Sequence, residues 1–189
     1  MTTTTTTQLP TGTWQLDTST TTVTLSVKKL GFITVPATLD VMSGSIEIDD
    51  DHQVKNVDIV VDASSYASKN AKRNEHVLGP DFLDAANHPT ISFRTGQVKS
   101  ASAGYTSNGT VTVKGQSSPI DVSISDVEVS GTNGSFAATA TVDRNALGVD
   151  KMPGLIVGRN LQLMVQAQAS TPPVDRSSVP TSTSDSARH

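Results

Sequence analysis

The feature that most constrains the fold is a two-residue alternation of apolar and polar side chains. In TVTLSVKK, Val23, Leu25 and Val27 share one face, and threonine, serine and lysine occupy the other. The same alternation recurs in SIEID, VDIVVD, TISFR, TVTVK, PIDVSIS, DVEVS, SFAATATV and LQLMVQAQA. This pattern is typical of antiparallel strands with one buried face. It predicts an all-β protein with eight or more strands.

Short turn-forming stretches separate these runs and predict hairpin connections. They are Ser43–Gly44, Asp49–His52, Asn108–Gly109, Lys114–Pro119 and Gly131–Gly134. Many strands joined by hairpins form either a β-sandwich or a closed barrel, and the periodicity alone fits both.

One segment, Ala67–Leu83, breaks the alternation and predicts a short helix. Ser68 or Asn70 can cap its start, and Gly79–Pro80 can end it. The segment contains few apolar residues. We therefore expect the helix to lie against the β structure or to cover the mouth of a barrel.

Small residues on the inward faces of the last two runs indicate space inside the fold. SFAATATV places Ala138 and Ala140 on its apolar face, and LQLMVQAQA places Ala167 and Ala169 there. A barrel of about eight strands has an interior that side chains just fill or that holds one small ligand. The alanines favour the second outcome, while a filled core in which they fit beside larger neighbours stays open.

Composition excludes several classes of function. The formal net charge is −4 and the basic residues are scattered, so we expect no nucleic-acid partner. The chain has no cysteine, which removes disulfides, thiolate catalysis and cysteine-ligated zinc. Neither a signal peptide nor an apolar run of about 20 residues is evident, which predicts a cytoplasmic protein without a membrane span.

The two ends of the chain differ in composition from the part between them. The threonine-rich residues 1–10 and the Ser/Thr/Pro-rich residues 171–189 offer little to bury, so we expect both to be disordered. Residues 11–170 are then the single folded domain.

Six motifs, in this order along the chain, resemble those of the YceI-like, lipocalin-resembling family of polyisoprenoid-binding proteins. They are GTWQLD (Gly12–Asp17), VKKLGF (Val27–Phe32), SGSIEID, KRNEHVLGPDFLDAANHPTISF (Lys72–Phe93), NGTVTVKGQSSPIDV (Asn108–Val122) and VDRNALGV (Val142–Val149). The resemblance covers roughly Gly12–Ala169. It implies an antiparallel, eight-stranded, extended lipocalin-like barrel with one short helix. It also implies that the barrel carries a polyisoprenoid or similar long-chain amphiphile, without catalysis or a cofactor, and it leaves a homodimer open.

The expected ligand-binding residues are apolar and come from strands, helix and loops. They are Val27, Leu30, Phe32, Leu78, Phe82, Phe93, Phe136, Met152, Leu155 and Ile156. A lumen lined by such residues binds through length and shape and needs no charged anchor. The last three lie in the Gly/Pro loop KMPGLIVG, where they form either a portal or a plug in the core.

Polar residues suggest the alternatives to a simple carrier. Arg73 and His76 share one face of the expected helix, where they either hold a ligand headgroup, act in acid–base chemistry, or fasten the helix to the barrel. Arg144 either meets a headgroup or pairs with a carboxylate such as Asp84. His76 and His88 match no zinc spacing, so we expect no metal site. The alternative functions are therefore an enzyme acting on an isoprenoid-like substrate and a filled barrel that serves only as an interaction domain.

Overall fold

The computed structural model describes residues 8–151 and 157–172, and within them nine strands form one antiparallel sheet. The threonine run, the expected C-terminal tail beyond residue 172, and the predicted ligand residues Met152, Leu155 and Ile156 lie outside the described residues. The strands are β1 (Gly12–Leu16), β2 (Thr22–Lys29), β3 (Ile33–Ile48), β4 (Val54–Ser68), β5 (Thr90–Ala101), β6 (Gly104–Val113), β7 (Gln116–Ser130), β8 (Asn133–Asp143) and β9 (Val157–Ser170).

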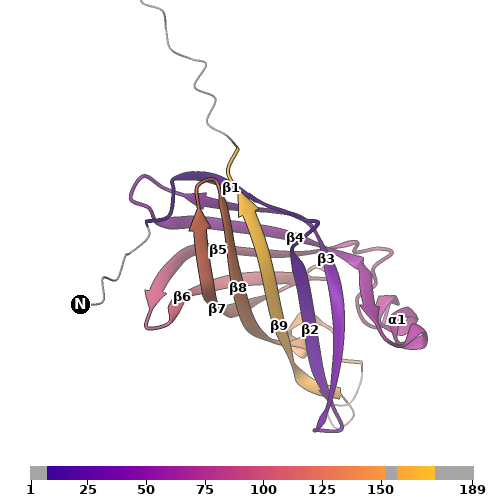
Figure 1. Cartoon of the computed structure of the whole chain (residues 1–189). Helices are drawn as coiled ribbons and strands as arrows, with labels where there is room; N and C mark the ends of the chain where they lie inside the picture. Colours follow the sequence, from indigo (N-terminus) through magenta and orange to yellow (C-terminus); the bar gives the residue numbers. More distant parts are fainter. Residues whose placement is uncertain (1–7, 152–156, 173–189) are drawn as a thin grey trace, which may run out of the picture.

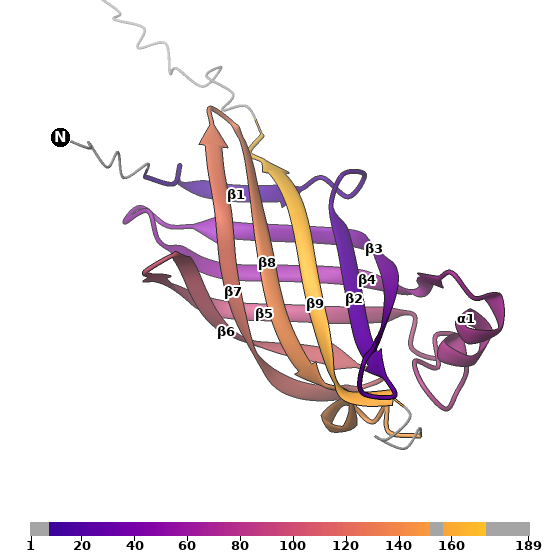
Figure 2. The same ribbon diagram turned by 60° about the horizontal axis from the view of Figure 1, so that its bottom comes forward.

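The sheet closes on itself into a barrel with eight positions around its circumference. Strands β2 to β9 follow one another around the ring, and β3 pairs with both β2 and β4 to complete the closure. Strand β1 pairs with β3 and β9 beyond the start of β2, so β1 and β2 share one position in the ring. Figures 1 and 2 show β7, β8 and β9 crossing β3, β4 and β5 on opposite sides of the barrel. The prediction of an antiparallel eight-stranded barrel is confirmed.

Helix α1 (Ala71–Leu78) lies outside one end of the barrel, between β4 and β5 (Figure 1). The Asn70 side chain caps it by accepting a hydrogen bond from the backbone N–H of Arg73 at 2.9 Å. The helix is shorter than expected at both ends. Ala67 and Ser68 belong to β4, and the chain leaves the helix at Gly79 before Pro80. A 3₁₀ helix, η1 (Arg144–Leu147), follows β8 at the same end of the barrel.

Two of the predicted turns are strand interiors in which glycine makes room for a neighbouring side chain. A Cβ on Gly44, inside β3, would lie 2.3 Å from Cδ1 of Leu16. A Cβ on Gly109, inside β6, would lie 2.7 Å from the Phe93 ring. The turn prediction at Ser43–Gly44 and Asn108–Gly109 was therefore wrong, because glycine in a strand also marks close packing.

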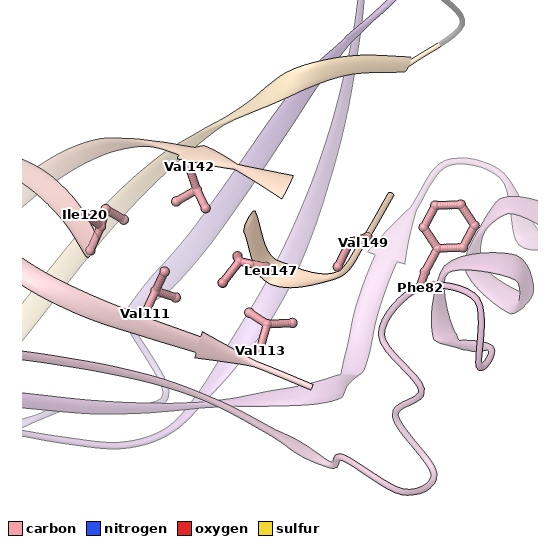
Figure 3. Packing of buried hydrophobic residues seen from close by; sticks show 7 residues of the cluster. All are labelled: Phe82, Val111, Val113, Ile120, Val142, Leu147 and Val149. Carbon is pink, nitrogen blue, oxygen red and sulfur yellow. The ribbon is translucent and has the colours of Figure 1, made fainter. Parts of the chain in front are cut away.

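The apolar core is divided into three clusters of buried residues instead of forming one mass. One, at the η1 end, is drawn in Figure 3 and comprises Phe82, Val111, Val113, Ile120, Val142, Leu147 and Val149. A second lies near α1 around Val23, Leu39 and Tyr66, and a third lies at the β1 end around Trp14 and Ala167. Between the clusters, inward-facing residues such as Leu25 and Leu163 are only half-buried. The middle of the barrel is therefore hollow.

The residues just before β1 contact the end of the barrel. Leu9 packs against the cluster around Trp14, and its carbonyl oxygen lies 2.8 Å from Nδ1 of His52. The Trp14 indole N–H donates to the carbonyl of Pro10 at 3.0 Å. Residues 9 and 10 thus pack over this end of the barrel.

Candidate functional site

The barrel encloses a cavity of about 340 Å³, within the roughly 300–1,000 Å³ typical of small-molecule sites. Its lining runs from Leu9 and Trp14 at the β1 end to Val77, Phe82 and Leu147 at the η1 end. Every strand contributes, because the alternation turns each second side chain inward. The cavity excludes the filled-barrel alternative.

Aliphatic side chains make up most of the cavity wall. Alanines on β8 keep it open, since Ala138 and Ala140 face inward opposite larger residues of β9 such as Val165 and Leu163. Such a surface attracts hydrocarbon by removing it from water, at about 0.8 kcal/mol for each buried methylene. The small inward residues on β8 were the sequence signal for this space.

The wall includes exposed residues on two adjacent strands. Glu128 of β7 and Thr139 of β8 belong to the lining and are exposed to solvent. Between them the β7–β8 register shifts from Ser125 to Glu128, and Asp126 adopts a φ of 52°. A β-bulge of this kind disrupts the ladder locally and increases the strand twist. The cavity wall on this side of the barrel therefore includes an irregular strand pair, a feature that the alternation does not reveal.

Two buried hydroxyl groups form a hydrogen-bonded pair in the otherwise apolar cavity wall. Thr95 of β5 and Ser107 of β6 are each 4% exposed, line the cavity, and hydrogen-bond to each other. Thr95 Oγ1 also donates to the carbonyl of Asn108 at 2.7 Å. Either hydroxyl can donate in the bond between them, and Ser107 Oγ also donates to the carbonyl of Gln97 at 3.4 Å. A hydroxyl oxygen has two acceptor positions, so Ser107 Oγ keeps one free in either arrangement. Inward serine and threonine within alternating strands were the sequence signal, but our site prediction did not include them.

Arg144 is the charged group buried deepest in the described wall, at 3% exposure. Its guanidinium donates to the carbonyl oxygens of Val149 (2.6 Å), Gly158 (3.0 Å) and Val157 (3.1 Å). These bonds tie η1 to the start of β9. The neighbouring carboxylate Asp143 forms its salt bridge with Arg159, 2.6 Å away, and this contact lowers the pKa of Asp143. Arg144 thus holds the barrel end together from inside the cavity.

The predicted apolar ligand residues divide into two groups in space. Val27, Phe82, Phe93 and Phe136 line the cavity. Leu78 packs beside the cluster around Tyr66, and its neighbour Val77 faces the cavity instead. Leu30 and Phe32 are outside the lining, exposed on the turn between β2 and β3, because the chain reverses there and the strand alternation ends. Whether the four lining residues contact a ligand stays a prediction.

Arg73 and His76 lie on α1, outside the cavity lining. Arg73 donates from Nη1 to the hydroxyl of Ser68, at 3.4 Å, at the end of β4. The exposed His76 ring meets the Phe82 ring edge to face, with centroids 5.0 Å apart. The first contact links the helix to the end of β4, and the second links it to the segment that follows the helix. His88, in the turn before β5, lies 4.0 Å from the carboxylate of Asp84.

Comparisons with known proteins agree with this architecture. The chain aligns with a UPF0312 protein of Yersinia pestis at 28% identity over 95 residues, about half the length of each protein. The crystal structure of BcnA from Burkholderia cenocepacia superposes with a TM-score of 0.71 and 19% identity, covering 82% of this chain and 99% of BcnA. A polyisoprenoid-binding domain from Saccharophagus degradans superposes with a TM-score of 0.65 and 13% identity, covering 84% and 98%.

The helices of the described residues include none long and apolar enough to cross a membrane. The sequence model of the YceI-like domain matches residues 14–169, from the Trp14 strand to the end of β9. The closed barrel, its cavity and the matched motifs coincide over the same residues. The chain belongs to the YceI-like family.

Proposed function

We propose that this protein binds a polyisoprenoid or a similar long-chain amphiphile in the barrel cavity and carries it without chemical change. The observation that carries the proposal is the apolar wall running from Trp14 to Leu147. A solved structural neighbour described as a polyisoprenoid-binding domain supports this ligand class. The carrier role is supported by Arg73 and His76, the residues of the enzymatic alternative, lying outside the cavity lining.

The hydroxyl pair refines the ligand class. A free acceptor on Ser107 Oγ suits a ligand that donates a hydrogen bond, so a lipid alcohol fits better than the corresponding hydrocarbon. Satisfying one polar group in an apolar wall fixes the position of an otherwise featureless chain.

The test is to identify the lipid that purifies with the protein, by organic extraction and native mass spectrometry. The same measurement is then made on a variant in which a larger side chain fills the cavity. Ala140→Phe places a ring inside the wall, whereas Thr141→Phe places the same ring on the exposed side of β8. We expect Ala140→Phe to abolish retention of a long-chain lipid and Thr141→Phe to retain it. Purified protein that never holds or takes up a long-chain lipid would refute the proposal.

The refinement has its own test. Ser107→Ala removes the free acceptor and leaves the Thr95 bond to Asn108 in place. In competition between a long-chain prenol and its hydrocarbon, we expect the wild type to prefer the prenol about five- to tenfold, the equivalent of one hydrogen bond. The Ser107→Ala protein should show no preference while still binding both. An unchanged preference would place the ligand hydroxyl elsewhere.

A further inference from the structure

Three of the five large apolar side chains that are exposed within the described residues lie at the end of one hairpin. Leu30 is 50% exposed, Phe32 76% and Ile33 42%; Leu30 and Phe32 belong to the turn between β2 and β3, and Ile33 is the first residue of β3. The other two, Met42 and Met164, lie singly on strands. We call residues 28–33 the β2–β3 tip. In Figure 1 the tip is the lower end of the β2–β3 hairpin.

The fold itself gives no reason for apolar residues at this tip. The turn is closed by the Lys29–Ile33 pair and by a hydrogen bond of 2.6 Å from Nζ of Lys28 to the Thr34 hydroxyl. Leu30 adopts a φ of 52°, which residues other than glycine and asparagine rarely adopt. Elsewhere in the barrel, the shorter turn between β7 and β8 is made by Gly131 and Thr132. Polar or glycine residues would therefore close the β2–β3 turn at least as well.

Charge distinguishes the β2–β3 tip from the turn at the other end of β3. Lys28 and Lys29 precede the apolar residues, and residues 27–35 contain no acidic side chain. Strand β3 leads from the tip to a turn at the other end that contains Asp49, Asp50 and Asp51. A negatively charged surface would attract the tip and repel the far turn, although the chain as a whole has a net charge of −4.

We propose that the β2–β3 tip docks onto a lipid bilayer that contains anionic lipids. Phe32, Leu30 and Ile33 would enter the boundary between headgroups and acyl chains, and Lys28 and Lys29 would lie among the headgroup phosphates. Apolar residues beside lysines are the usual chemistry of interfacial membrane binding. A stable protein partner would need about 800 Å² on each side, more than a protruding turn offers, whereas a fluid bilayer accommodates a small convex tip.

The position of the tip relates docking to the cavity. Val27, three residues before Leu30 on the same strand, lines the cavity, and Val157 lines it where β9 pairs with Lys29. Docking would bring this end of the cavity beside the bilayer. Only this last relation depends on the proposed lipid-carrier function; the docking does not.

The experiment is flotation of the full chain with vesicles of phosphatidylcholine alone and of phosphatidylcholine with phosphatidylglycerol. We expect binding to the anionic vesicles that weakens as sodium chloride is added. Phe32→Ser should weaken it about tenfold, since one large apolar side chain no longer leaves water. Lys28→Gln with Lys29→Gln should weaken it about tenfold on anionic vesicles only, at roughly a few-fold for each lysine.

Matched controls distinguish docking of the tip from nonspecific hydrophobic adsorption and from ligand binding in the cavity. Met42→Ser and Met164→Ser remove exposed apolar residues elsewhere on the barrel and should leave vesicle binding unchanged. Phe32→Trp adds a second tryptophan to the buried Trp14, and its added emission should shift to shorter wavelength with anionic vesicles. Circular dichroism of each tip variant checks that it folds. Lipid retained in the cavity of Phe32→Ser should match the wild type, so either proposal can fail alone.

Two outcomes would overturn the docking proposal. One is vesicle binding that is absent, or that Phe32→Ser does not reduce. The other is a wild-type dimer in light scattering that Phe32→Ser dissociates without any vesicle binding, which would assign the tip to a second copy of the chain.

Discussion

The cavity wall and the β2–β3 tip are both apolar and adjoin on one strand, yet they face opposite environments. Val27 lines the cavity, while Phe32, five residues later, is 76% exposed. The strand alternation determines the direction of Val27, and it ends where Leu30 and Gly31 reverse the chain with positive φ. The strand alternation, which directs neighbouring apolar residues into the barrel, therefore does not determine the direction of an apolar residue in the turn. Such residues need an explanation outside the core.

The largest expected contrast compares two phenylalanines. Phe82 is buried in the cluster at the η1 end, so Phe82→Ala should lower the free energy of unfolding by about 3–5 kcal/mol. Phe32→Ala should change it by no more than about 0.5 kcal/mol, because the side chain is solvated already. Urea unfolding followed by circular dichroism measures both. Comparable losses would mean that the tip belongs to the core.

A second contrast compares two arginines at the same end of the barrel. Arg144→Met should cost about 3 kcal/mol, since buried carbonyls of Val149, Val157 and Gly158 lose their donor. Arg159→Met removes only an exposed salt bridge to Asp143 and should cost at most about 1 kcal/mol. The measurement is again urea unfolding. An Arg144→Met protein as stable as Arg159→Met would show that η1 needs no anchor.

The smallest expected effect is a dependence of stability on alkaline pH. Burial in the cavity wall raises the pKa of Tyr66 above its usual value of 10.0, while the charge of Arg73 and the Ser68 hydroxyl act in the opposite direction. Because the folded protein favours the neutral phenol, this contribution is complete below about pH 10 and is lost as pH rises through the pKa of the folded state.

Thermal unfolding measured between pH 8 and 11 tests this effect. Tyr66→Phe should reduce the alkaline loss of stability, and Tyr105→Phe, which removes the other tyrosine of the chain, serves as the control. An identical pH profile for Tyr66→Phe and the wild type would assign the alkaline loss to other groups.

Features that follow local rules along the chain were predicted correctly from the sequence. Features that form where distant segments meet were not. The cap at Asn70 and the helix end at Gly79 follow from local chemistry. By contrast, Gly44 and Gly109 have the turn chemistry of a hairpin but serve the packing of Leu16 and Phe93 from other strands. The candidate site gives a further example. Thr95 and Ser107 form a hydrogen-bonded pair only because β5 and β6 lie side by side in the sheet.

The sequence by itself determined the all-β class, the inward faces of the alternating runs, the alanines that leave space, and the family, because alternation and motif order are local properties of the chain. The tertiary structure decided that the barrel closes with β1 and β2 sharing one position. It also decided that Arg144 lies inside and that Phe32 lies outside. These outcomes depend on pairing register and on chain reversal, which bring together residues that the sequence separates.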